Sequence, residues 1–384
     1  MSIWVNCVSR ANAFVLCAFI CWAYYPRPMP FRSPNLRLGE LDAQRICLIK
    51  PSALGDIVQT LPLLGVLRRR FPTAMISWVI RRDLADLVTG HPDLSEVLPY
   101  HRHGSWRDAW HLLRLLRRRR FDLVFDLQGL LRTAVMTLAT RAPIRVGLET
   151  AREGSGLACN LVLPNSGRDV PAYRRYWRVA EALGLGDVAA TTLVPTTTAD
   201  EDWLADQLRR LPRPILAIHP GAGWVTKRWP IEKFAEIARR FPGSVVVVGA
   251  PGEQLAGTQI ADAVTTCRRP ALNLAGQTTL KQLACLLRAA DLMLSNDSGP
   301  LHLAAGLGTP VVGIFTCTSP VLSGPAGTIH ELVSTNVDCA AGYHKTCPYR
   351  GPRRLACLSD LSTERVWNAV ERILSRAPAT ARRA

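Results

Sequence analysis

The chain has 384 residues, a length that indicates two domains, each with its own core. A hydrophobic content of 48% and a charged content of 20% are typical of a globular protein rather than a disordered one. The formal net charge of +17 comes mostly from arginine and favours anionic partners, namely nucleic acid, acidic lipid headgroups or phosphorylated substrates.

Residues 1–44 read as an N-terminal extension outside the regular pattern. The apolar run at residues 11–25 is shorter than a membrane-spanning helix needs and has no clear cleavage site. Three interpretations remain: a membrane-surface anchor, a signal or short span, or an extension upstream of a true start at Met29. We favour the last of these or a peripheral anchor. Residues 25–44 read as a loose tether.

From Arg45 onward, strand-like and helix-like patterns alternate. In the first half they predict strands at 45–50, 74–80, 95–100, 121–128 and 145–148, and helices at 57–70, 81–92, 106–120 and 130–140. Alternation of this kind is the signature of a parallel sheet wrapped by helices.

A threonine- and proline-rich stretch at residues 193–214 interrupts this pattern, which then restarts. The second half is predicted to hold a strand that opens the segment 215–223, further strands at 244–250, 272–276, 292–297 and 311–315, and helices at 231–241, 254–264, 280–290 and from 298. The sequence therefore predicts an α/β fold with two Rossmann-like domains facing a cleft, at residues 45–197 and 198–358, and a terminal helix and tail at 359–384.

Several common site types are disfavoured. Neither half carries a G-x-G-x-x-G fingerprint or a G-x-x-x-x-G-K-[ST] loop, which argues against a dinucleotide dehydrogenase and a P-loop NTPase. No nucleic-acid-binding motif is present, so such a role would depend on charge alone.

The eleven cysteines lie mostly in apolar runs, as in a protein of a reducing compartment. Cys339, Cys347 and Cys357 lack the close pairs of common zinc sites, so we expect no metal, although this stays open for these three.

Three unusual loops follow predicted strands. "KPSALGD" ends in Asp56 at a helix start, where an aspartate is more often a cap than a catalyst. "HPGAGWVTKRWP" carries Lys227 and Arg228, a basic pair that suits an anion or simply water. "SNDSGPLHLAAG" begins a short helix that Ser298 can cap, and the free N–H groups there suit an anion. An ordinary capped helix is the alternative.

Four segments together resemble a known family. "ICLIKPSALGDIVQTLPLL", "FDLVFDLQGLLRTA", "HPGAGWVTKRWPIEKFAEIA" and "NDSGPLHLAAGLGTPVVGIFTCTSP" are similar, in order, to glycosyltransferase family 9, the ADP-heptose:lipopolysaccharide heptosyltransferases. The resemblance implies a GT-B fold, in which the first domain holds the acceptor, the second holds the nucleotide sugar, and a terminal helix crosses back to the first. "FTCTSP" and "VPAYRR" depart from the family pattern, which usually has Gly-Pro before the first threonine and a histidine near the second segment.

The resemblance also implies roles for residues. Asp56 matches the catalytic base. The donor-side residues are Lys227, Glu253, Asp297, Ser298, Gly299 and His302. The expected acceptor-side residues are Ser52, Gly55, Gln128, Arg132 and Arg152. Lys227 and the helix N–H groups would hold the diphosphate without a metal or other cofactor. Asp297 would be repelled by a diphosphate, so we expect it to face sugar hydroxyls or Lys227.

We therefore expect an inverting glycosyltransferase that moves a heptose from ADP-heptose to the inner core of lipopolysaccharide, cytoplasmic and peripheral on the inner membrane. The arginine-rich first domain would suit an anionic glycolipid acceptor. A family member with another nucleotide sugar or a protein acceptor is the nearest alternative. A non-catalytic anion- or nucleic-acid-binding protein on the same scaffold is the more distant one, and we expect no nucleic-acid partner.

Overall fold

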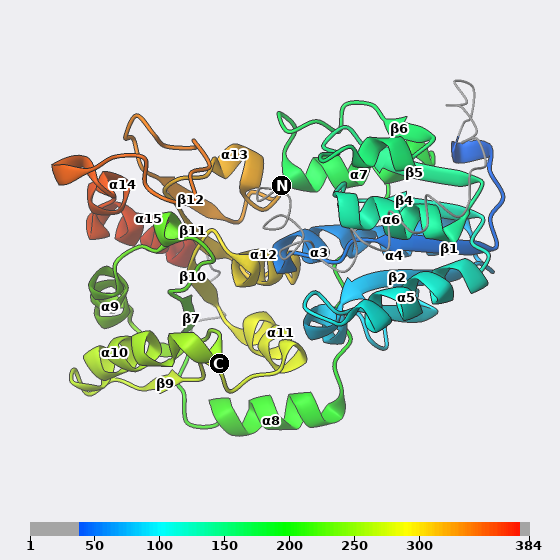
Figure 1. Ribbon diagram of the computed structural model, residues 1–384. Helices are drawn as coiled ribbons and strands as arrows, with labels where there is room; N and C mark the ends of the chain where they lie inside the picture. Colours follow the sequence, from blue (N-terminus) through cyan, green and yellow to red (C-terminus); the bar gives the residue numbers. More distant parts are fainter. Residues whose placement is uncertain (1–37, 377–384) are drawn as a thin grey trace. The chain divides into compact units, whose positions relative to one another are not determined.

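The computed structural model describes residues 38–376, and the chain divides into two compact units (Figure 1). The first unit extends to Val170 and includes Arg174–Thr191, and the second includes Pro171–Tyr173 and continues from Thr192. The apolar run at residues 11–25 lies outside the described residues. No described helix is long and apolar enough to cross a membrane.

The first unit is built on a six-stranded parallel sheet. Its strands are β1 (Arg45–Ile49), β2 (Met75–Arg81), β3 (Glu96–Tyr100), β4 (Leu123–Asp126), β5 (Ile144–Leu148) and β6 (Leu161–Leu163). They lie in the order β3-β2-β1-β4-β5-β6, so the direction in which strands are added reverses between β1 and β4. Open α/β sheets bind ligands at such a reversal, beyond the carboxyl ends of the strands.

The helices of the first unit differ in part from the prediction. They are α3 (Leu54–Thr60), α4 (Pro62–Arg70), α5 (Trp106–Arg118), α6 (Leu131–Thr140) and α7 (Ala172–Ala182). The single helix predicted at 57–70 is wrong because Pro62, which has no N–H, begins a new helix. The short helix predicted at 81–92 is a 3-10 helix at Arg82–Leu87. The sequence pattern did not predict β6 or α7.

The second unit repeats the same strand order on a second six-stranded parallel sheet. Its strands are β7 (Ile215–His219), β8 (Ser244–Val247), β9 (Ala271–Asn273), β10 (Leu292–Asn296), β11 (Val311–Phe315) and β12 (Glu331–Ser334). The order β12-β11-β10-β7-β8-β9 places the reversal between β7 and β10, the counterparts of β1 and β4. β12 was missing from the prediction.

Most helices of the second unit were predicted from the sequence. They are α8 (Thr198–Leu208), α9 (Ile231–Arg240), α10 (Gln254–Thr265), α11 (Leu280–Ala289), α12 (Gly299–Gly306), α13 (Pro320–Ser323), α14 (Ala356–Asp360) and α15 (Thr363–Arg376). α9 and α10 pack side by side, and α8 packs on α11 (Figure 1).

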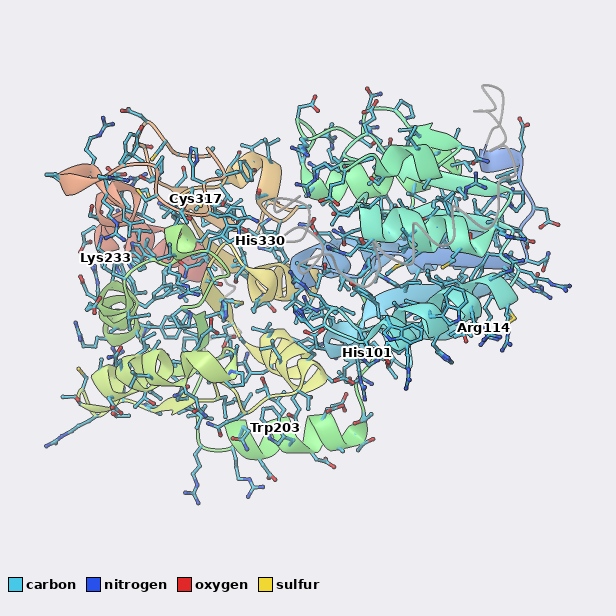
Figure 2. The ribbon with its side chains drawn as sticks, in the orientation of Figure 1. His101, Arg114, Trp203, Lys233, Cys317 and His330 are labelled. Carbon is cyan, nitrogen blue, oxygen red and sulfur yellow. The ribbon has the colours of Figure 1, made fainter. Side chains whose placement is uncertain are left out.

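The terminal helix α15 contacts α9, β11 and β12, all in the second unit. Its buried residues Val366, Val370 and Ile373 join the core that also contains Phe234. Lys233 of α9 (Figure 2) donates from its Nζ to the carbonyl oxygen of Leu361 at 2.7 Å and so holds the chain where α15 begins. The crossing of this helix to the first unit stays a prediction.

Candidate active site

Each unit gathers polar side chains at the reversal of its strand order. In the first unit they follow β1 and β4, and in the second they follow β7 and β10.

Asp56 is the centre of the cluster in the first unit. It lies in the first turn of α3, and its Oδ2 lies 3.2 Å from Nζ of Lys50, the residue that follows β1. Oδ1 accepts a hydrogen bond from the hydroxyl of Tyr176 on α7 at 3.0 Å. The backbone N–H of Ala53 donates to Oδ2 at 3.3 Å, so Asp56 also caps its helix. Asp56 therefore both caps the start of α3 and belongs to the polar cluster.

Charge in this cluster is set by the ion pair. Burial opposes ionisation of Asp56, but the charge of Lys50 and the hydrogen bonds from Ala53, Tyr176 and Lys50 together outweigh it and hold the pKa of Asp56 below its usual range. Burial likewise opposes the charge on Lys50, but the charges of and hydrogen bonds with Asp56 and Tyr176 together outweigh it and raise the pKa of Lys50. Burial, followed by the charge of Asp56, raises the pKa of Tyr176 to about 12, which keeps its phenol a neutral donor. The side chain of Lys50 is 3% exposed and that of Asp56 is 37% exposed, so this pair presents its anion to solvent.

The loop after β4 supplies the next residues of the cluster. The side-chain oxygen of Gln128 accepts from the backbone N–H of Ser52 at 3.3 Å, which joins the loops that follow β1 and β4. Oδ1 of Asp126 accepts from the backbone N–H groups of Gln128 and Gly129, each at 3.0 Å. Burial raises the pKa of Asp126. Two of the residues expected on the acceptor side, Ser52 and Gln128, are therefore neighbours.

The expected residues Arg132 and Arg152 are brought near the same loop through Gly129. The carbonyl of Gly129 accepts from the backbone N–H of Arg152 at 2.9 Å. Gly129 has φ +64°, and a Cβ there would lie 2.9 Å from Cα of Ala151, so only glycine fits. Arg132 is half-buried, and its Nε has no hydrogen-bond partner in the described part of the chain. Gly55, the remaining expected residue, lies in α3 beside Asp56.

Asp297 is the centre of the cluster in the second unit. Its Oδ2 lies 2.6 Å from Nζ of Lys227 and accepts a hydrogen bond from the hydroxyl of Thr318 at 2.6 Å. Nε2 of His302, on α12, lies 3.6 Å from Oδ1. Of the two partners predicted for Asp297, sugar hydroxyls or Lys227, the structure has the contact with Lys227.

This second ion pair presents its cation. The side chain of Asp297 is 5% exposed and that of Lys227 is 16% exposed. Burial opposes ionisation of Asp297, but the nearby His302 and the contact with Lys227 together outweigh it and hold its pKa far below the usual range. The Lys227 ammonium also lies 4.7 Å from the ring centroid of Trp224, a cation–π contact that helps orient it.

Beside this pair, a histidine links two strand ends. Nδ1 of His219, the last residue of β7, lies 3.0 Å from Oγ of Ser298, and Nε2 lies 3.2 Å from Oε2 of Glu253. Oγ of Ser295 lies 3.0 Å from that of Ser298. Ser298 does stand at the N-cap position of α12, but its side chain makes no capping hydrogen bond, so the expected cap is wrong. The Ser298 hydroxyl instead contacts His219 and Ser295.

Glu253 fits into this cluster only because two neighbours are glycines. A Cβ on Gly221 would lie 1.5 Å from Oε1 of Glu253, and a Cβ on Gly249 would lie 2.5 Å from Oε2. Burial opposes ionisation of Glu253, but the contact with His219, the backbone N–H of Ala250 and the charge of Arg228 together outweigh it and lower its pKa.

Asn296 fixes the loop after β7 against the start of α12. Its side-chain nitrogen donates to the carbonyl of Pro220 at 2.7 Å, and its side-chain oxygen accepts from the backbone N–H of Trp229 at 3.2 Å. Lys227 and Gly299, the first residue of α12, are thereby carried on two segments that one buried amide holds together.

No group of three or more metal-binding side chains is placed to hold a metal among residues 38–376. Cys339, Cys347 and Cys357 are free. Burial, followed by the nearby thiols of Cys339, Cys317 and Cys347, raises the pKa of Cys357 to about 11.

The two parallel six-stranded sheets and their helices have the GT-B arrangement that is found in solved glycosyltransferase structures. The family model of glycosyltransferase family 9 (heptosyltransferase) matches residues 109–352, and the chain belongs to this family. Its relatives include the lipopolysaccharide core heptosyltransferase OpsX of Haemophilus influenzae, 27% identical over 75% of this chain and 84% of that protein. Lipopolysaccharide heptosyltransferase 1 of Pseudomonas aeruginosa is 29% identical over 83% of this chain and 92% of that protein. Among solved structures, ADP-heptose lps heptosyltransferase II of E. coli matches with a TM-score of 0.68 and 25% identity, over 86% of this chain and 99% of that one.

Sequence reasoning missed several residues of both clusters. Lys50 and His219 each lie where a strand gives way to a loop, within segments that resemble the family. That position at the end of a strand was the feature that could have identified them as site residues. Tyr176 lies on α7, a helix that the pattern did not predict. Thr318 lies in the stretch "FTCTSP", where the sequence departs from the family pattern.

Proposed function

We propose that this protein is an inverting glycosyltransferase that moves a heptose from ADP-heptose to the inner core of lipopolysaccharide, at the cytoplasmic face of the inner membrane. Its relatives support the reaction: they are lipopolysaccharide heptosyltransferases, and one solved structure of the same fold holds ADP-2-deoxy-2-fluoro heptose. The observation that carries the proposal is Asp56, an ionised and accessible carboxylate at the strand reversal of the first unit.

In this proposal the second unit binds the donor. Lys227 presents a cation beside the first turn of α12, and both groups favour the diphosphate of the nucleotide sugar. Glu253 would accept hydrogen bonds from ribose hydroxyls. Asp297 is engaged by Lys227 and Thr318, so its part is to hold the lysine in place rather than to contact phosphate, which would repel it.

The first unit binds the acceptor and supplies the base. The acceptor hydroxyl oxygen attacks the anomeric carbon of the heptose from the face opposite the diphosphate. The bond from that carbon to the phosphate oxygen breaks, ADP leaves with the bonding electrons, and the hydroxyl proton passes to Asp56. The charge that builds up on the departing diphosphate is stabilised by Lys227 and the N–H groups of α12.

The low pKa of Asp56 determines how this base can act. It is free of a proton at neutral pH, so it is always available, but it is too weak to ionise a sugar hydroxyl beforehand. Proton transfer therefore accompanies bond formation, when the attacking oxygen becomes acidic. Lys50 keeps the carboxylate ionised, and Tyr176 occupies Oδ1, which leaves the exposed side of the carboxylate for the acceptor.

A donor panel tests the proposal. The purified chain is incubated with ADP-heptose and with other nucleotide sugars, together with a water-soluble, deacylated inner-core acceptor, and the products are identified by mass spectrometry. We expect transfer from ADP-heptose with inversion at the anomeric carbon. Transfer from another donor, or to a protein, would establish one of the alternative family activities. No transfer from any donor, with ADP still bound, would support the non-catalytic binder.

A further inference from the structure

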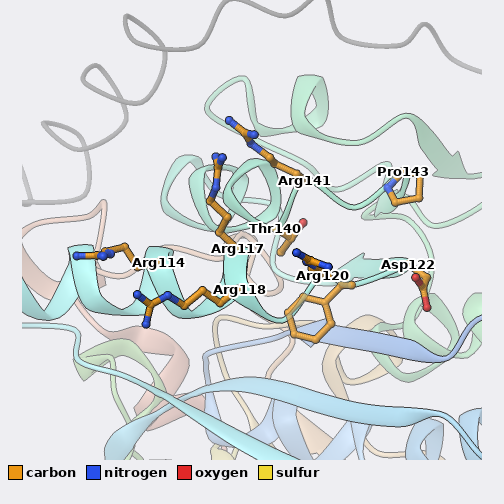
Figure 3. A pocket seen from close by; sticks show the side chains of 9 residues that line it. Arg114, Arg117, Arg118, Arg120, Asp122, Thr140, Arg141 and Pro143 are labelled. Atoms are coloured by element: carbon orange, nitrogen blue, oxygen red, sulfur yellow. The ribbon is translucent and has the colours of Figure 1, made fainter.

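The solvent-facing side of α5 carries a dense group of arginines. They line an open hollow of about 730 Å³ at the carboxyl end of the helix, together with residues just before β4 and residues at and just after the end of α6. Figure 3 shows Arg117 and Arg141 extending to the same side of this hollow. Its basic lining residues are Arg114, Arg117, Arg118, Arg120 and Arg141.

Aromatic side chains extend the same surface toward the start of α5. Trp106 is 60% exposed and Trp110 is 39% exposed, which is unusual for such large apolar groups. They line a second hollow of about 420 Å³ with Arg107, Arg114 and Arg118. Because Arg114 and Arg118 line both hollows, the surface is continuous. We call it the α5 basic face, made of Trp106, Arg107, Trp110, Arg114, Arg117, Arg118, Arg120 and Arg141.

Two carboxylates at this face, Asp108 in the first turn of α5 and Asp122 in the lining of the first hollow, already have hydrogen-bond partners. Asp108 accepts hydrogen bonds from the backbone N–H and hydroxyl of Ser105 at the start of α5. Asp122 accepts from the backbone N–H groups of Gln44 and Arg45. No ion pair involves Arg107, Arg114, Arg118 or Arg120 within the part of the chain that the structure describes.

The arginines of the α5 basic face do not pack in the core of the first unit. The other side of α5 buries Ala109, Leu112, Leu113 and Leu116 in the core of the first unit, and those residues suffice to dock the helix. Arg114 stands three and four positions before Arg117 and Arg118, and like charges at these spacings destabilise a helix. A surface with this cost and this composition is explained by an anionic partner that compensates it.

We propose that the α5 basic face docks the protein on a membrane rich in anionic phospholipid. Arginine pairs with phosphate through its planar guanidinium, and tryptophan rings favour the level of the lipid headgroups. A polyanion in solution would pair with the arginines, but it would not account for the exposed indole rings of Trp106 and Trp110 on the same face. The inference deepens the proposed membrane association by naming its surface, but it does not depend on the identity of the donor sugar.

Vesicle flotation tests this surface in the full-length chain. Wild-type protein is expected to float with vesicles of phosphatidylglycerol and phosphatidylcholine, and not with phosphatidylcholine alone. Each basic side chain near an anionic surface contributes about fivefold to binding, so Arg107→Gln/Arg114→Gln/Arg118→Gln should weaken it by about 100-fold. Glutamine keeps the helix propensity of these positions. Residues 1–44 are unchanged in every variant, so any contribution from them cancels.

A matched control removes the same charge elsewhere. Arg210→Gln/Arg239→Gln/Arg268→Gln lowers the formal net charge from +17 by the same three units, at exposed positions of the second unit. It should bind vesicles within about twofold of wild type if the face is specific. Equal losses in the two triple variants, or vesicle binding by neither wild type nor control, would overturn the proposal.

Two further measurements separate the possible sources of failure. Brominated acyl chains should quench tryptophan fluorescence in wild type more than in Trp106→Phe/Trp110→Phe, and equal quenching would contradict docking by this face. Tighter binding of the face to a DNA duplex than to the vesicles would assign it to nucleic acid instead. Turnover with the deacylated, water-soluble acceptor should be unchanged in the α5 triple variant. A wild type that binds vesicles but transfers no heptose would refute the proposed reaction alone.

Discussion

The two units carry the same ion pair in opposite orientations. In the first, Lys50 is buried at 3% exposure and Asp56 is open at 37%. In the second, Asp297 is buried at 5% and the more exposed partner is Lys227, at 16%. Both pairs lie at the reversal of an identical strand order. The comparison shows that a lysine–aspartate pair can present either charge, depending on which partner the core encloses. The proposed base and the proposed diphosphate-binding cation lie at equivalent places of the two sheets.

The largest effect is expected for Asp56→Asn, which removes the exposed carboxylate of the pair in the first unit. Asparagine keeps the shape of the side chain but cannot take the acceptor proton, and general bases contribute about 10²–10⁴ in rate. Turnover should fall by that factor while ADP affinity, measured by isothermal titration, stays at the wild-type value. Near-normal turnover would leave this residue as the cap of α3 that the hydrogen bond from Ala53 also describes.

Lys227→Ala removes the more exposed partner of the pair in the second unit and should weaken binding of the nucleotide sugar. It removes a charge-assisted contact of about 1.5–3 kcal/mol, which corresponds to roughly 10- to 150-fold weaker binding of the nucleotide sugar. Gly299→Val leaves every charge in place but obstructs approach to the first turn of α12, and it should also weaken donor binding.

The double variant sharpens this test. If Lys227 and α12 act on the same diphosphate, Lys227→Ala/Gly299→Val should lose less affinity than the sum of the single losses. Lys50→Met serves as the control in the other unit and should leave donor affinity unchanged. A folded Gly299→Val protein with wild-type donor affinity would remove the diphosphate from this helix.

Tyr176→Phe should have a smaller effect on the first pair. The phenol donates to Oδ1 of Asp56 and helps keep its pKa low, so its loss should raise that pKa. The acid limb of the kcat/KM profile, where Asp56 gains a proton, should move to higher pH, with only a few-fold loss of activity at neutral pH. An unmoved acid limb would show that Tyr176 acts on packing alone.

The smallest effect is expected for the buried Asp297, on the free energy of unfolding at low pH. Its pKa in the folded state lies far below the usual value for an aspartate, about 3.9, so its ionisation stabilises the fold above that pH, and this stability is lost as pH falls through the folded pKa. Asp297→Asn should therefore show a shallower decline in the free energy of unfolding between about pH 4 and pH 2, measured in urea titrations. Parallel declines in both proteins would show that the pair does not set this dependence.

Sequence pattern predicted the architecture well because strands and helices alternate with clear periodicity over both units. It failed where a local rule overrides the period, as at Pro62, and where elements are short, as at β6 and β12. Among the site residues, Asp56 and Lys227 stand out in their loops, whereas Lys50 reads as the polar end of a strand. Its role depends on being enclosed beside Asp56, and enclosure is a property of three-dimensional packing that spacing along the chain does not encode.

The glycines that surround Glu253 bear on how this family can vary. Gly221 and Gly249 contribute no side chain to the second cluster, yet a methyl group on either would overlap the carboxylate that His219 holds. The packing of the second cluster therefore restricts positions that contribute no side chain to it. In a survey of natural or randomised variants, alanine at these two glycines should be tolerated chiefly where residue 253 has also become smaller, so that sequence drift at the three positions is linked.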